Sequence, residues 1–347
     1  MSESDWKRRA TVHDVARAAG VSLATVDRVL NGRPGVRAQT IEKVEAAIAA
    51  IGFQRDLSAS LLARARDIAV VFLIPAGSNE FMASLVDVVE GRIDAARHER
   101  VNIEVQRVRA LDGVALAAAL DGLSPRTCDC AVIVASEEPE VLAAVDAASK
   151  RGIIVLTLVS DLPGSLRSHF IGIDNVAAGR TAASLMGRFL PQGGKIGVIA
   201  GSLHLRDHAD RLAGFKAVLT AEFTTLELIG PLEGHDESAV TDAVVADLLA
   251  RHPDLGGLYN LGAGTAGLVA ALERSGRGGA VRVIAHELSA PTRQGLASGA
   301  IDVVLDQNPD GEIRAAIAAA RTLTIGRGGS VVTDPIEIGI FLRDNLR

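Results

Sequence analysis

The 347-residue chain is long enough for two or three domains. Its 48% hydrophobic and 22% charged residues are typical of a well-packed globular protein and exclude a disordered chain. The sequence holds no apolar run long enough to span a membrane, and its polar N-terminus lacks the apolar segment of a secretion signal, so we expect a cytoplasmic protein.

Charge is unevenly distributed along the chain. Residues 1–66 carry 11 Lys and Arg against 7 Asp and Glu, a net charge of +4, whereas residues 67–347 carry 25 against 35, a net charge of −10. A basic head on an acidic body indicates an anionic partner that only the head meets, although simple solvation also explains so small a positive excess.

The N-terminal region is typical of two short helices joined by a tight turn. Thr11, followed three residues later by Asp14, predicts the start of the first helix through an acidic capping box. Gly20 supplies the turn, because glycine adopts a left-handed helix exit without penalty. Ser22 then predicts the cap of the second helix. The apolar residues expected to face inward are Val12, Val15, Ala16, Ala19, Val26, Val29 and Leu30.

This helix-turn-helix pattern leaves Leu23, Ala24, Asp27 and Arg28 on the outer face of the second helix. Such a motif places the N-terminal residues of its second helix against base edges in the major groove of DNA. A helical hairpin inside a larger helical domain is the alternative. A third helix, predicted over 36–51 with one apolar face, would complete a three-helix core and favours the DNA-binding interpretation.

The run from Thr11 to Gly32, the third helix ending in Ala-Ile-Gly-Phe-Gln-Arg and the segment from Ala59 to Leu62 resemble the DNA-binding headpiece of the lactose-repressor (LacI) family of transcription regulators. The resemblance implies an all-α headpiece over 1–56 and a hinge helix or linker over 57–66. In that hinge Leu62 would wedge between base pairs in the minor groove. The residues that the resemblance assigns to DNA contact are Thr11, Ser22, Leu23, Ala24, Thr25, Asp27, Arg28, Asn31, Arg37, Thr40, Ala59 and Leu62.

Within that set, the resemblance implies base reading by Leu23, Ala24 and Arg28, and phosphate contact near Thr25, Asn31, Arg37 and Thr40. Two residues depart from the family pattern. Asp27 stands where the family usually has Ser, and a carboxylate near phosphates is repulsive unless it accepts from a cytosine amino group or pairs with an Arg. Arg37 replaces the usual N-cap Ser of the third helix, so the operator need not be a standard one.

From residue 67 onward, short apolar runs alternate with amphipathic stretches. Such runs predict strands buried on both faces of parallel sheets that helices cover. About ten strands are better divided between two sheets of five or six than kept in one. The predicted strands are 68–74, 101–105, 131–135, 153–158, 170–173, 195–200, 226–230, 257–260, 281–285 and 301–305, and the predicted helices include 82–97, 112–122, 139–151 and 176–190.

Two doubly wound lobes leave a crevice beyond the carboxyl ends of their strands, where ligands bind in such sheets. The pattern resembles the type I periplasmic-binding-protein-like fold that forms the effector-binding and dimerisation body of LacI-family regulators, here 67–347. The resemblance implies one lobe at about 67–173 plus 308–333, a second at about 174–307 plus 334–347, and chain crossings near 173–175, 306–308 and 333–334.

Polar residues at the ends of the predicted strands are the candidates for effector contact. Arg211 resembles the family arginine that holds effector hydroxyls, although a surface ion pair with Asp207 or Asp210 is the alternative. Asp174-Asn175 suits ligand contact and equally suits the cap of the next helix. Scarce aromatic residues favour a sugar or polyol over a nucleobase. The candidates are Asn79, Phe81 as a stacking platform, Ser160, Asp161, Arg211, Asn260, His286, Glu287 and Gln307.

A rival interpretation rests on the run from Gly262 to Gly267, which is a literal G-x-G-x-x-G with Glu287 twenty residues beyond it. This dinucleotide-binding fingerprint leaves two alternatives open, an NAD(H)-sensing regulator and a dehydrogenase-like domain. Against that interpretation, the motif opens a late unit of its sheet, and no array of Lys, Tyr, Ser or His indicates hydride transfer. A free periplasmic transport protein is a third interpretation, which the DNA-reading head disfavours.

The remaining motifs point away from catalysis and metal binding. No H-E-x-x-H, G-x-S-x-G or P-loop occurs, so we expect no enzymatic activity. Cys128 and Cys130 cannot chelate a metal by themselves, and a disulfide across one residue would be strained, so we expect free thiols, no metal and no cofactor. We therefore expect an effector-controlled repressor that binds pseudo-palindromic operator DNA as a homodimer, because one headpiece reads only a few base pairs.

Overall fold

The computed structural model describes residues 10–30, 35–51, 53, 67–326 and 335–346. They fall into two compact units, one with the N-terminal residues up to Ile68 and 321–326, the other with 69–320 and 335–346. The second unit is called the body below. The predicted hinge over 57–66 with Ala59 and Leu62, the phosphate-contact candidate Asn31 and the predicted third crossing at 333–334 lie outside the described residues.

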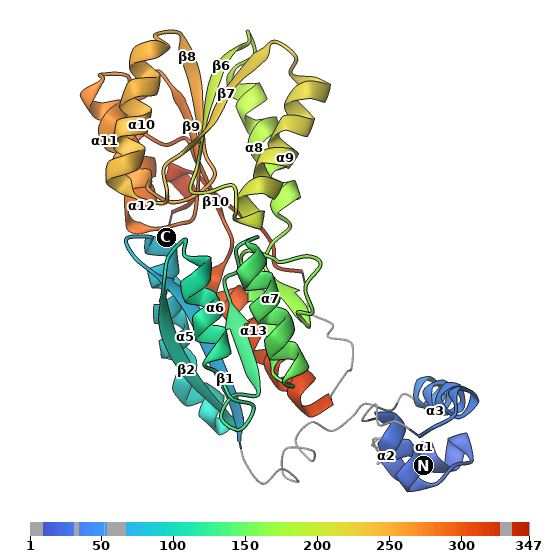
Figure 1. Cartoon of the computed structure of the whole chain (residues 1–347). Coiled ribbons are helices and arrows are strands. Elements are labelled where there is room, and N and C mark those ends of the chain that lie inside the picture. The colour runs from blue at the N-terminus through green and yellow to red at the C-terminus, as the bar shows by residue number, and fades with distance from the viewer. Residues whose placement is uncertain (1–9, 31–34, 52, 54–66, 327–334, 347) are drawn as a thin grey trace, which may run out of the picture. The chain divides into compact units, whose positions relative to one another are not determined.

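The N-terminal unit contains α1 (Val12–Ala19), α2 (Leu23–Leu30) and α3 (Ala38–Ile51), drawn in blue in Figure 1. Each helix contributes one fully buried valine, namely Val15, Val26 and Val44. This arrangement confirms the predicted three-helix core. Helix α3 begins at Ala38, two residues later than predicted. The other apolar residues that pack around the three valines include Val12, Ala16, Ala19, Val29, Leu30, Ile48 and Ile51.

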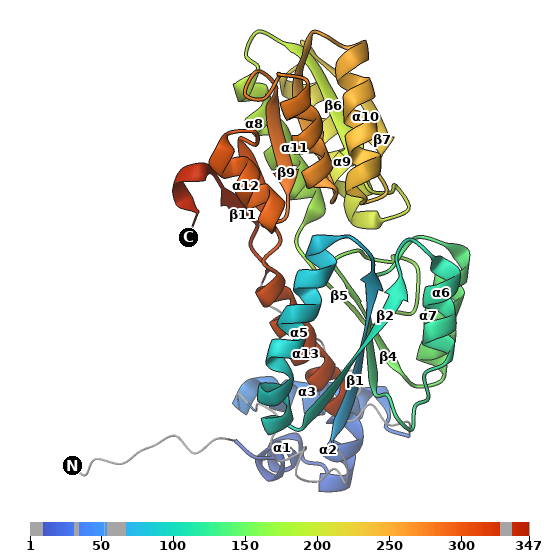
Figure 2. The ribbon, with the colours of Figure 1, turned by 90° about the vertical axis from the view of Figure 1, so that its left-hand side faces the viewer.

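The first lobe of the body is built on a sheet with the order β2-β1-β3-β4-β5 in the described residues. Strands β1, β3, β4 and β5 pair in parallel. Helices α6 and α7 cover one face, and α5 with the part of α13 up to residue 320 lies on the other (Figure 2). The elements are β1 (Ile68–Ala76), α5 (Glu80–His98), β2 (Val101–Arg109), α6 (Gly113–Asp121), β3 (Cys130–Ile133), α7 (Pro139–Lys150), β4 (Ile154–Leu158), β5 (His169–Ile171) and α13 (Pro309–Gly326).

The second lobe has the strand order β11-β10-β9-β8-β6-β7 in the described residues. Helices α8 and α9 pack on one face around Phe215 and Tyr259, and α10, α11 and α12 pack on the other around Leu248 and Leu268. The elements are α8 (Asn175–Phe189), β6 (Gly194–Ala200), α9 (Arg206–Glu222), β7 (Leu226–Glu233), α10 (Ser238–Arg251), β8 (Leu255–Asn260), α11 (Thr265–Arg274), β9 (Arg282–His286), α12 (Ala290–Ser298), β10 (Val303–Asp306), β11 (Gly339–Phe341) and the short 3₁₀ helix η1 (Arg343–Asn345).

The two-lobed α/β fold class and all ten predicted strands are confirmed, with two differences. Strands β2, β5 and β7 are edge strands, and most of their side chains are only partly buried or exposed, so the prediction of burial on both faces is wrong for them. Strand β11 was not predicted. It runs antiparallel to β10. Because it has only three residues, its apolar pattern is too short to predict a strand.

The chain passes from the first lobe to the second at 172–174 and returns at 307–308. As a result, loops that follow strands of both sheets meet between the lobes.

Cys128 and Cys130 are buried free thiols, and burial raises the pKa of Cys128 to about 11. Among the described helices, none is long and apolar enough to cross a membrane.

Candidate functional site

A cavity between the two lobes is lined by loops that follow β1, β3 and β4 of the first sheet and β6 to β10 of the second. It holds about 350 Å³ of space, part of which is open solvent. We call it the polar chamber. Six of the nine predicted effector-binding residues line it, namely Asn79, Phe81, Ser160, Arg211, Glu287 and Gln307. Three polar residues that were not predicted also line it, namely Asp207, His208 and Asp236.

Arg211 is the most constrained cation of the polar chamber, with a side chain only 1% exposed. Its Nε donates to Asn175 Oδ1 at 2.8 Å, and its Nη1 donates to the Leu261 carbonyl oxygen at 2.6 Å. Its Nη2 lies 3.5 Å from Glu287 Oε1. The alternative of an ion pair with Asp207 is borne out, with Nη2 3.9 Å from Asp207 Oδ2, but the pair is buried and not at the surface. Asp210 pairs with Arg206 instead. A guanidinium fixed on several sides is a preorganised donor for a ligand oxygen.

Glu287 follows β9 with a left-handed φ of 66°, a conformation uncommon for a residue with a side chain. Its Oε1 accepts from Gln307 Nε2 at 2.6 Å. Burial raises the pKa of Glu287 to about 8, and the nearby Arg211 guanidinium partly opposes this shift. Near neutral pH the carboxyl group is therefore able both to donate and to accept a hydrogen bond.

Three acceptor atoms around Arg211 are buried without a hydrogen-bond partner in the described part of the chain. They are Asp207 Oδ1, Glu287 Oε2 and Gln307 Oε1. Buried polar atoms are nearly always hydrogen-bonded, and leaving one unpaired costs about 1–3 kcal/mol. Acceptors grouped in this way around a fixed guanidinium can bind a ligand that offers several hydroxyl donors.

The two lobes contact each other directly at the polar chamber. Asn79 Nδ2 donates to Asp236 Oδ2 at 3.1 Å, and Ser160 Oγ accepts from the Arg206 backbone N–H at 2.9 Å. Asn79 also caps α5, because its Oδ1 accepts from the backbone N–H groups of the first turn. Through these contacts, groups of the first lobe hold loops of the second lobe.

Three predicted effector residues do not line the polar chamber. Asn260 is fully buried, and its Nδ2 donates to the Ala263 carbonyl oxygen and to Thr265 Oγ1, both at 3.1 Å. Asp161 accepts from Arg167 Nη2 at 2.6 Å and lines a separate cavity near the start of α8. Local hydrogen bonds thus explain both residues without a ligand.

His286 is the third such residue, and it lines a neighbouring cavity at the start of α11. Its Nε2 lies 2.9 Å from the Tyr259 hydroxyl in a buried aromatic cluster. Burial, with smaller contributions from Arg211 and His208, keeps the pKa of His286 well below its usual value. The ring is therefore neutral and serves packing in the second lobe.

The structure separates the roles of the pair Asp174-Asn175. Asp174 Oδ1 accepts from the Ala177 backbone N–H at 2.9 Å and caps α8, which the cap alternative predicted. Asn175 is buried and holds Arg211 from one side. It is a positioning residue for the guanidinium.

Close packing explains the G-x-G-x-x-G motif. A Cβ at Gly267 would lie 1.8 Å from the Ser238 carbonyl oxygen, so only glycine lets α11 approach α10 this closely. Gly264 has a φ of 80°, which favours glycine. A Cβ at Gly262 would lie 2.6 Å from Asp236 Oδ1 beside the polar chamber. The motif therefore needs no dinucleotide to account for its glycines.

In the N-terminal unit, α2 presents the predicted recognition face to solvent. Leu23 is 42% exposed, and Ala24, Asp27 and Arg28 are exposed beside it. Ser22 Oγ accepts from the Thr25 backbone N–H at 3.1 Å, which confirms the predicted cap of this helix.

The other DNA-contact candidates in the described residues lie at helix starts. Thr11 and Asp14 form the predicted capping box, with the Thr11 hydroxyl donating to Asp14 Oδ2 at 2.6 Å. Arg37 is exposed directly before α3, and its carbonyl oxygen accepts from the Thr40 N–H at 2.8 Å. Exposed backbone and side-chain groups at helix starts are suited to phosphate contact.

Comparison with known proteins identifies a matching domain family for each of the two units. Residues 11–56 match the model of bacterial regulatory proteins of the lacI family, and residues 70–328 match the periplasmic binding protein domain. The chain combines a lacI-family domain at its N-terminal end with a periplasmic binding protein domain. Its larger part is a periplasmic binding protein domain, which agrees with the two-lobed fold described above.

Individual relatives resemble different parts of this chain. Catabolite control protein A of Priestia megaterium is 41% identical over 93 residues, which is 27% of each chain. The D-ribose/D-allose-binding protein of Pseudomonas aeruginosa is 26% identical over 222 residues, covering 60% of this chain and 69% of that protein. A solved ABC transporter solute-binding protein from Burkholderia graminis, in complex with D-arabinose, has a TM-score of 0.74 at 26% identity, covering 81% of this chain and 97% of that one.

Proposed function

We propose that this LacI-family protein is a transcriptional repressor whose affinity for operator DNA is set by a small polyhydroxylated ligand, an aldose sugar or related polyol, bound in the polar chamber. The observation that carries the proposal is the group of unpaired buried acceptors around the fixed Arg211 guanidinium. Donor and acceptor are both available there, and a vicinal diol uses both at once.

The ligand class is supported by the proteins that share the fold. One of them is named a D-ribose/D-allose-binding protein, and another is a solute-binding protein solved in complex with D-arabinose. Phe81 lies in the wall of the polar chamber, where its ring could pack on the apolar face of a sugar. No part of this proposal uses a dinucleotide, because packing alone accounts for the glycine motif.

The DNA partner follows from the N-terminal unit. We assign base reading to the exposed α2 residues Leu23, Ala24 and Arg28. The chain matches only 27% of catabolite control protein A of Priestia megaterium, so operator binding, a dimeric state and a cytoplasmic location are part of the proposal. We place the headpiece at 1–56, the hinge at 57–66 and the effector body at 67–347, and we assign no enzymatic activity.

Two titrations test the proposal. Isothermal calorimetry of the full chain with D-arabinose, D-ribose, D-allose, D-glucose and D-galactose should reveal binding of at least one aldose. A duplex selected by the protein from random-sequence DNA should bind at moderate salt, and its affinity should change when that aldose is added. Failure to select any duplex, or binding of NADH without a response to any aldose, would contradict the proposal.

A further inference from the structure

A separate cavity lies where the chain crosses from the first lobe to the second. It holds about 500 Å³ of space, part of which is open solvent. Four aspartates line it: Asp161 from the first lobe, Asp174 at the crossing, and Asp207 and Asp210 from α9 of the second lobe. Among the described residues that line this cavity, Arg206 is the only cation. We call it the acidic chamber.

The arginines around the acidic chamber are already engaged. Arg206 Nε donates to Asp210 Oδ1 at 2.8 Å, and its Nη1 donates to Glu137 Oε1 at 3.2 Å. Asp161 Oδ2 accepts from Arg167 Nη2 at 2.6 Å. Two of the four aspartates thus have an arginine partner at hydrogen-bond distance, and the same partners leave little positive charge for the other two.

The remaining two aspartates are Asp174 and Asp207. Asp174 is exposed, and its Oδ1 caps α8 by accepting from the Ala177 backbone N–H. Asp207 has only a long ion pair, with its Oδ2 3.9 Å from Arg211 Nη2. Counted with their ion-pair partners, the five carboxylates of Asp161, Asp174, Asp207, Asp210 and Glu137 face the three guanidinium groups of Arg167, Arg206 and Arg211. The chamber therefore has an excess of negative charge.

Asp207 also carries an unsatisfied acceptor. Its side chain is 6% exposed, and its Oδ1 has no hydrogen-bond partner among the described residues. Its Oδ2 is the oxygen that lies near Arg211 and 3.7 Å from His208 Nε2, and these two residues line the polar chamber but not the acidic chamber. Asp207 thus turns Oδ2 toward one chamber and offers Oδ1 on the side of the other, while Glu287 Oε2 and Gln307 Oε1 remain unpaired for a sugar.

The rest of the acidic chamber includes apolar surface. Phe170 lines it from β5, and its ring lies against the chain crossing, because a Cβ at Gly172 would be 2.4 Å from Phe170 Cζ. Val176 lines it from the first turn of α8 and is 41% exposed. An aromatic face attracts an organic cation, and exposed apolar side chains gain free energy when a hydrocarbon chain covers them.

The carboxylates are spread over both lobes and do not gather in the way that metal ligands do. No three His, Cys, Asp or Glu residues in the described part of the chain form a group that could hold a metal ion. Calcium and magnesium need several oxygen atoms around one point. Carboxylates that line separate walls of one cavity suit a ligand whose positive charges are separated by a chain.

We propose that the acidic chamber binds an aliphatic diammonium cation, with its ammonium groups at Asp207 and Asp174 and its methylene chain on Phe170 and Val176. An ammonium group donates hydrogen bonds and carries the charge that both carboxylates lack. This second ligand site is separate from the sugar site, so the inference does not depend on the proposed function.

Calorimetry of the full chain at fixed, moderate salt tests the inference with 1,3-diaminopropane, 1,4-diaminobutane and 1,5-diaminopentane. At least one diamine should bind. Butylamine should bind at least about tenfold more weakly, because one carboxylate stays without a cation, and neutral 1,4-butanediol should not bind. Absence of binding by all three diamines, or equal binding of butylamine and the best diamine, would overturn the inference. Displacement of the diamine by an equal concentration of Mg²⁺ would show a general counterion effect and would also overturn it.

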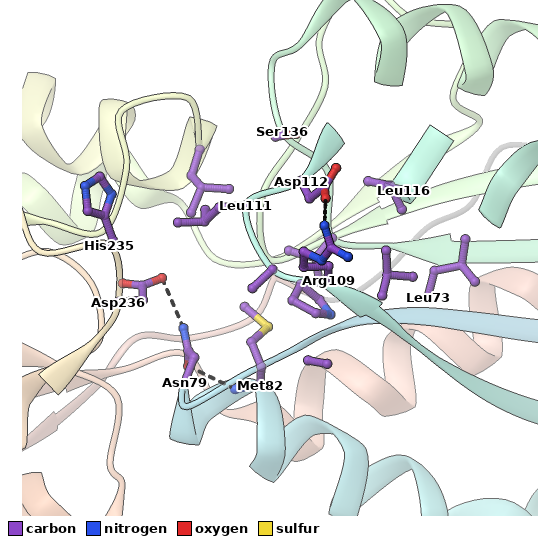
Figure 3. A pocket seen from close by; sticks show the side chains of 16 residues that line it. Leu73, Asn79, Met82, Arg109, Leu111, Asp112, Leu116, Ser136, His235 and Asp236 are labelled. Atoms are coloured by element: carbon purple, nitrogen blue, oxygen red, sulfur yellow. Dashed lines mark hydrogen bonds and ion pairs between the residues drawn. The ribbon is translucent and has the colours of Figure 1, made fainter. Parts of the chain in front are cut away.

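Substitutions locate the bound diamine. Asp174→Asn removes a charge but keeps a good helix cap, so it should weaken diamine binding at least about fivefold without unfolding the protein. Asp112→Asn is the matched control. Asp112 caps α6 in the same way, through the Ala115 N–H at 2.9 Å, but lines a different cavity, at the ends of β1 and β2 (Figure 3), so its substitution should leave diamine binding unchanged.

Phe170→Leu keeps an apolar side chain but removes the aromatic face, and it should weaken diamine binding several-fold. Diamine affinity that survives both Asp174→Asn and Phe170→Leu, or that falls equally in Asp112→Asn, would place the diamine elsewhere and contradict the inference. The sugar titrations are read separately. Diamine binding without binding of any aldose would support this inference and contradict the proposed function, and the reverse result would do the opposite.

Discussion

The N-terminal unit and the body use their residues in opposite ways. The recognition face of α2 is formed by neighbouring exposed residues, over a core with one buried valine from each helix. The polar chamber of the body is formed by buried residues from loops as far apart as Asn79 and Gln307. A surface that reads DNA needs only a stable scaffold and side chains in water, whereas a site that surrounds a small ligand must hold polar groups away from water.

That difference has an energetic consequence. Exposed charged residues such as Arg28 contribute little to folding, because water solvates them in both states. A buried guanidinium is tolerated only with good partners, and Arg211 has a carboxamide, a carbonyl oxygen and a nearby carboxyl group. Substitutions of buried residues in the polar chamber should therefore change stability and ligand binding together, whereas substitutions of exposed residues on α2 should change DNA binding alone.

The largest expected effect is on the stability of the body. Arg211→Ala removes the donor that pairs with Asn175 Oδ1, the Leu261 carbonyl oxygen, Asp207 and Glu287, all of them buried, and we expect the free energy of unfolding to fall by about 3–5 kcal/mol. Arg97→Ala is the matched control, because Arg97 pairs with Asp94 at 3.0 Å while 63% exposed, and it should cost less than about 1 kcal/mol. Urea unfolding followed by circular dichroism measures both, and equal losses would contradict the role given to Arg211.

The second prediction concerns the recognition face. Arg28→Ala should weaken binding to the selected duplex by about 1–3 kcal/mol and leave aldose binding unchanged. Arg17→Ala is the control, because Arg17 is an exposed arginine of α1 that pairs with Asp14, and its loss should affect all DNA sequences alike. Fluorescence anisotropy on specific and random duplexes measures the difference, and an unchanged specific affinity of Arg28→Ala would remove that residue from the interface.

The third prediction separates packing from cofactor binding in the glycine motif. Gly267→Ala should destabilise the second lobe by about 1–3 kcal/mol, because the added Cβ would overlap the Ser238 carbonyl oxygen at the α10–α11 contact. Gly278→Ala is the control, since a Cβ there would meet no atom within 4 Å. If thermal unfolding shows the two variants to be equally stable, the packing explanation is wrong.

The fourth prediction concerns the pH dependence of stability. The pKa of Glu287 is about 8 in the folded protein and near its usual 4.5 in the unfolded chain. Between these values the folded state holds a proton that the unfolded state has lost, so stability should fall as the pH rises, by at most about 1.4 kcal/mol per pH unit for this group.

Glu287→Gln removes that titration and should make the decline with pH shallower. Urea unfolding at several pH values between about pH 5 and about pH 8 compares the variant with the unsubstituted protein. Parallel declines in the two proteins would show that Glu287 is ionised in the folded state.

The sequence predicts most of the fold because its signals are local. The helix-turn-helix lies in one continuous segment, and ten apolar runs mark the strands. The rule that ligands bind beyond strand ends also selects Arg211, Glu287 and Gln307, which the fold brings together. The same rule applied after β7 would have selected Asp236, and the helical spacing of four residues from Arg211 would have selected Asp207.

What the sequence could not predict depends on side-chain direction and local pairing. Asn260 and Asp161 stand at strand ends like the residues that line the polar chamber, but each is turned away by hydrogen bonds within its own loop. The cavity at the ends of β1 and β2, whose walls include Leu73, Met82 and Leu116, could not be predicted either, because these apolar residues come from several elements and are typical of an ordinary core.

One measurement tests most directly the claim that the two regions act as one regulator. Fluorescence anisotropy gives the Kd of the full chain for its selected duplex at fixed salt, with and without a saturating concentration of the aldose that binds in calorimetry. We predict a change in Kd of about 5-fold to 150-fold for the unsubstituted protein. Glu287→Ala should bind the duplex with the same Kd but show no response to the sugar. Binding of the aldose with no change in DNA affinity would contradict the account.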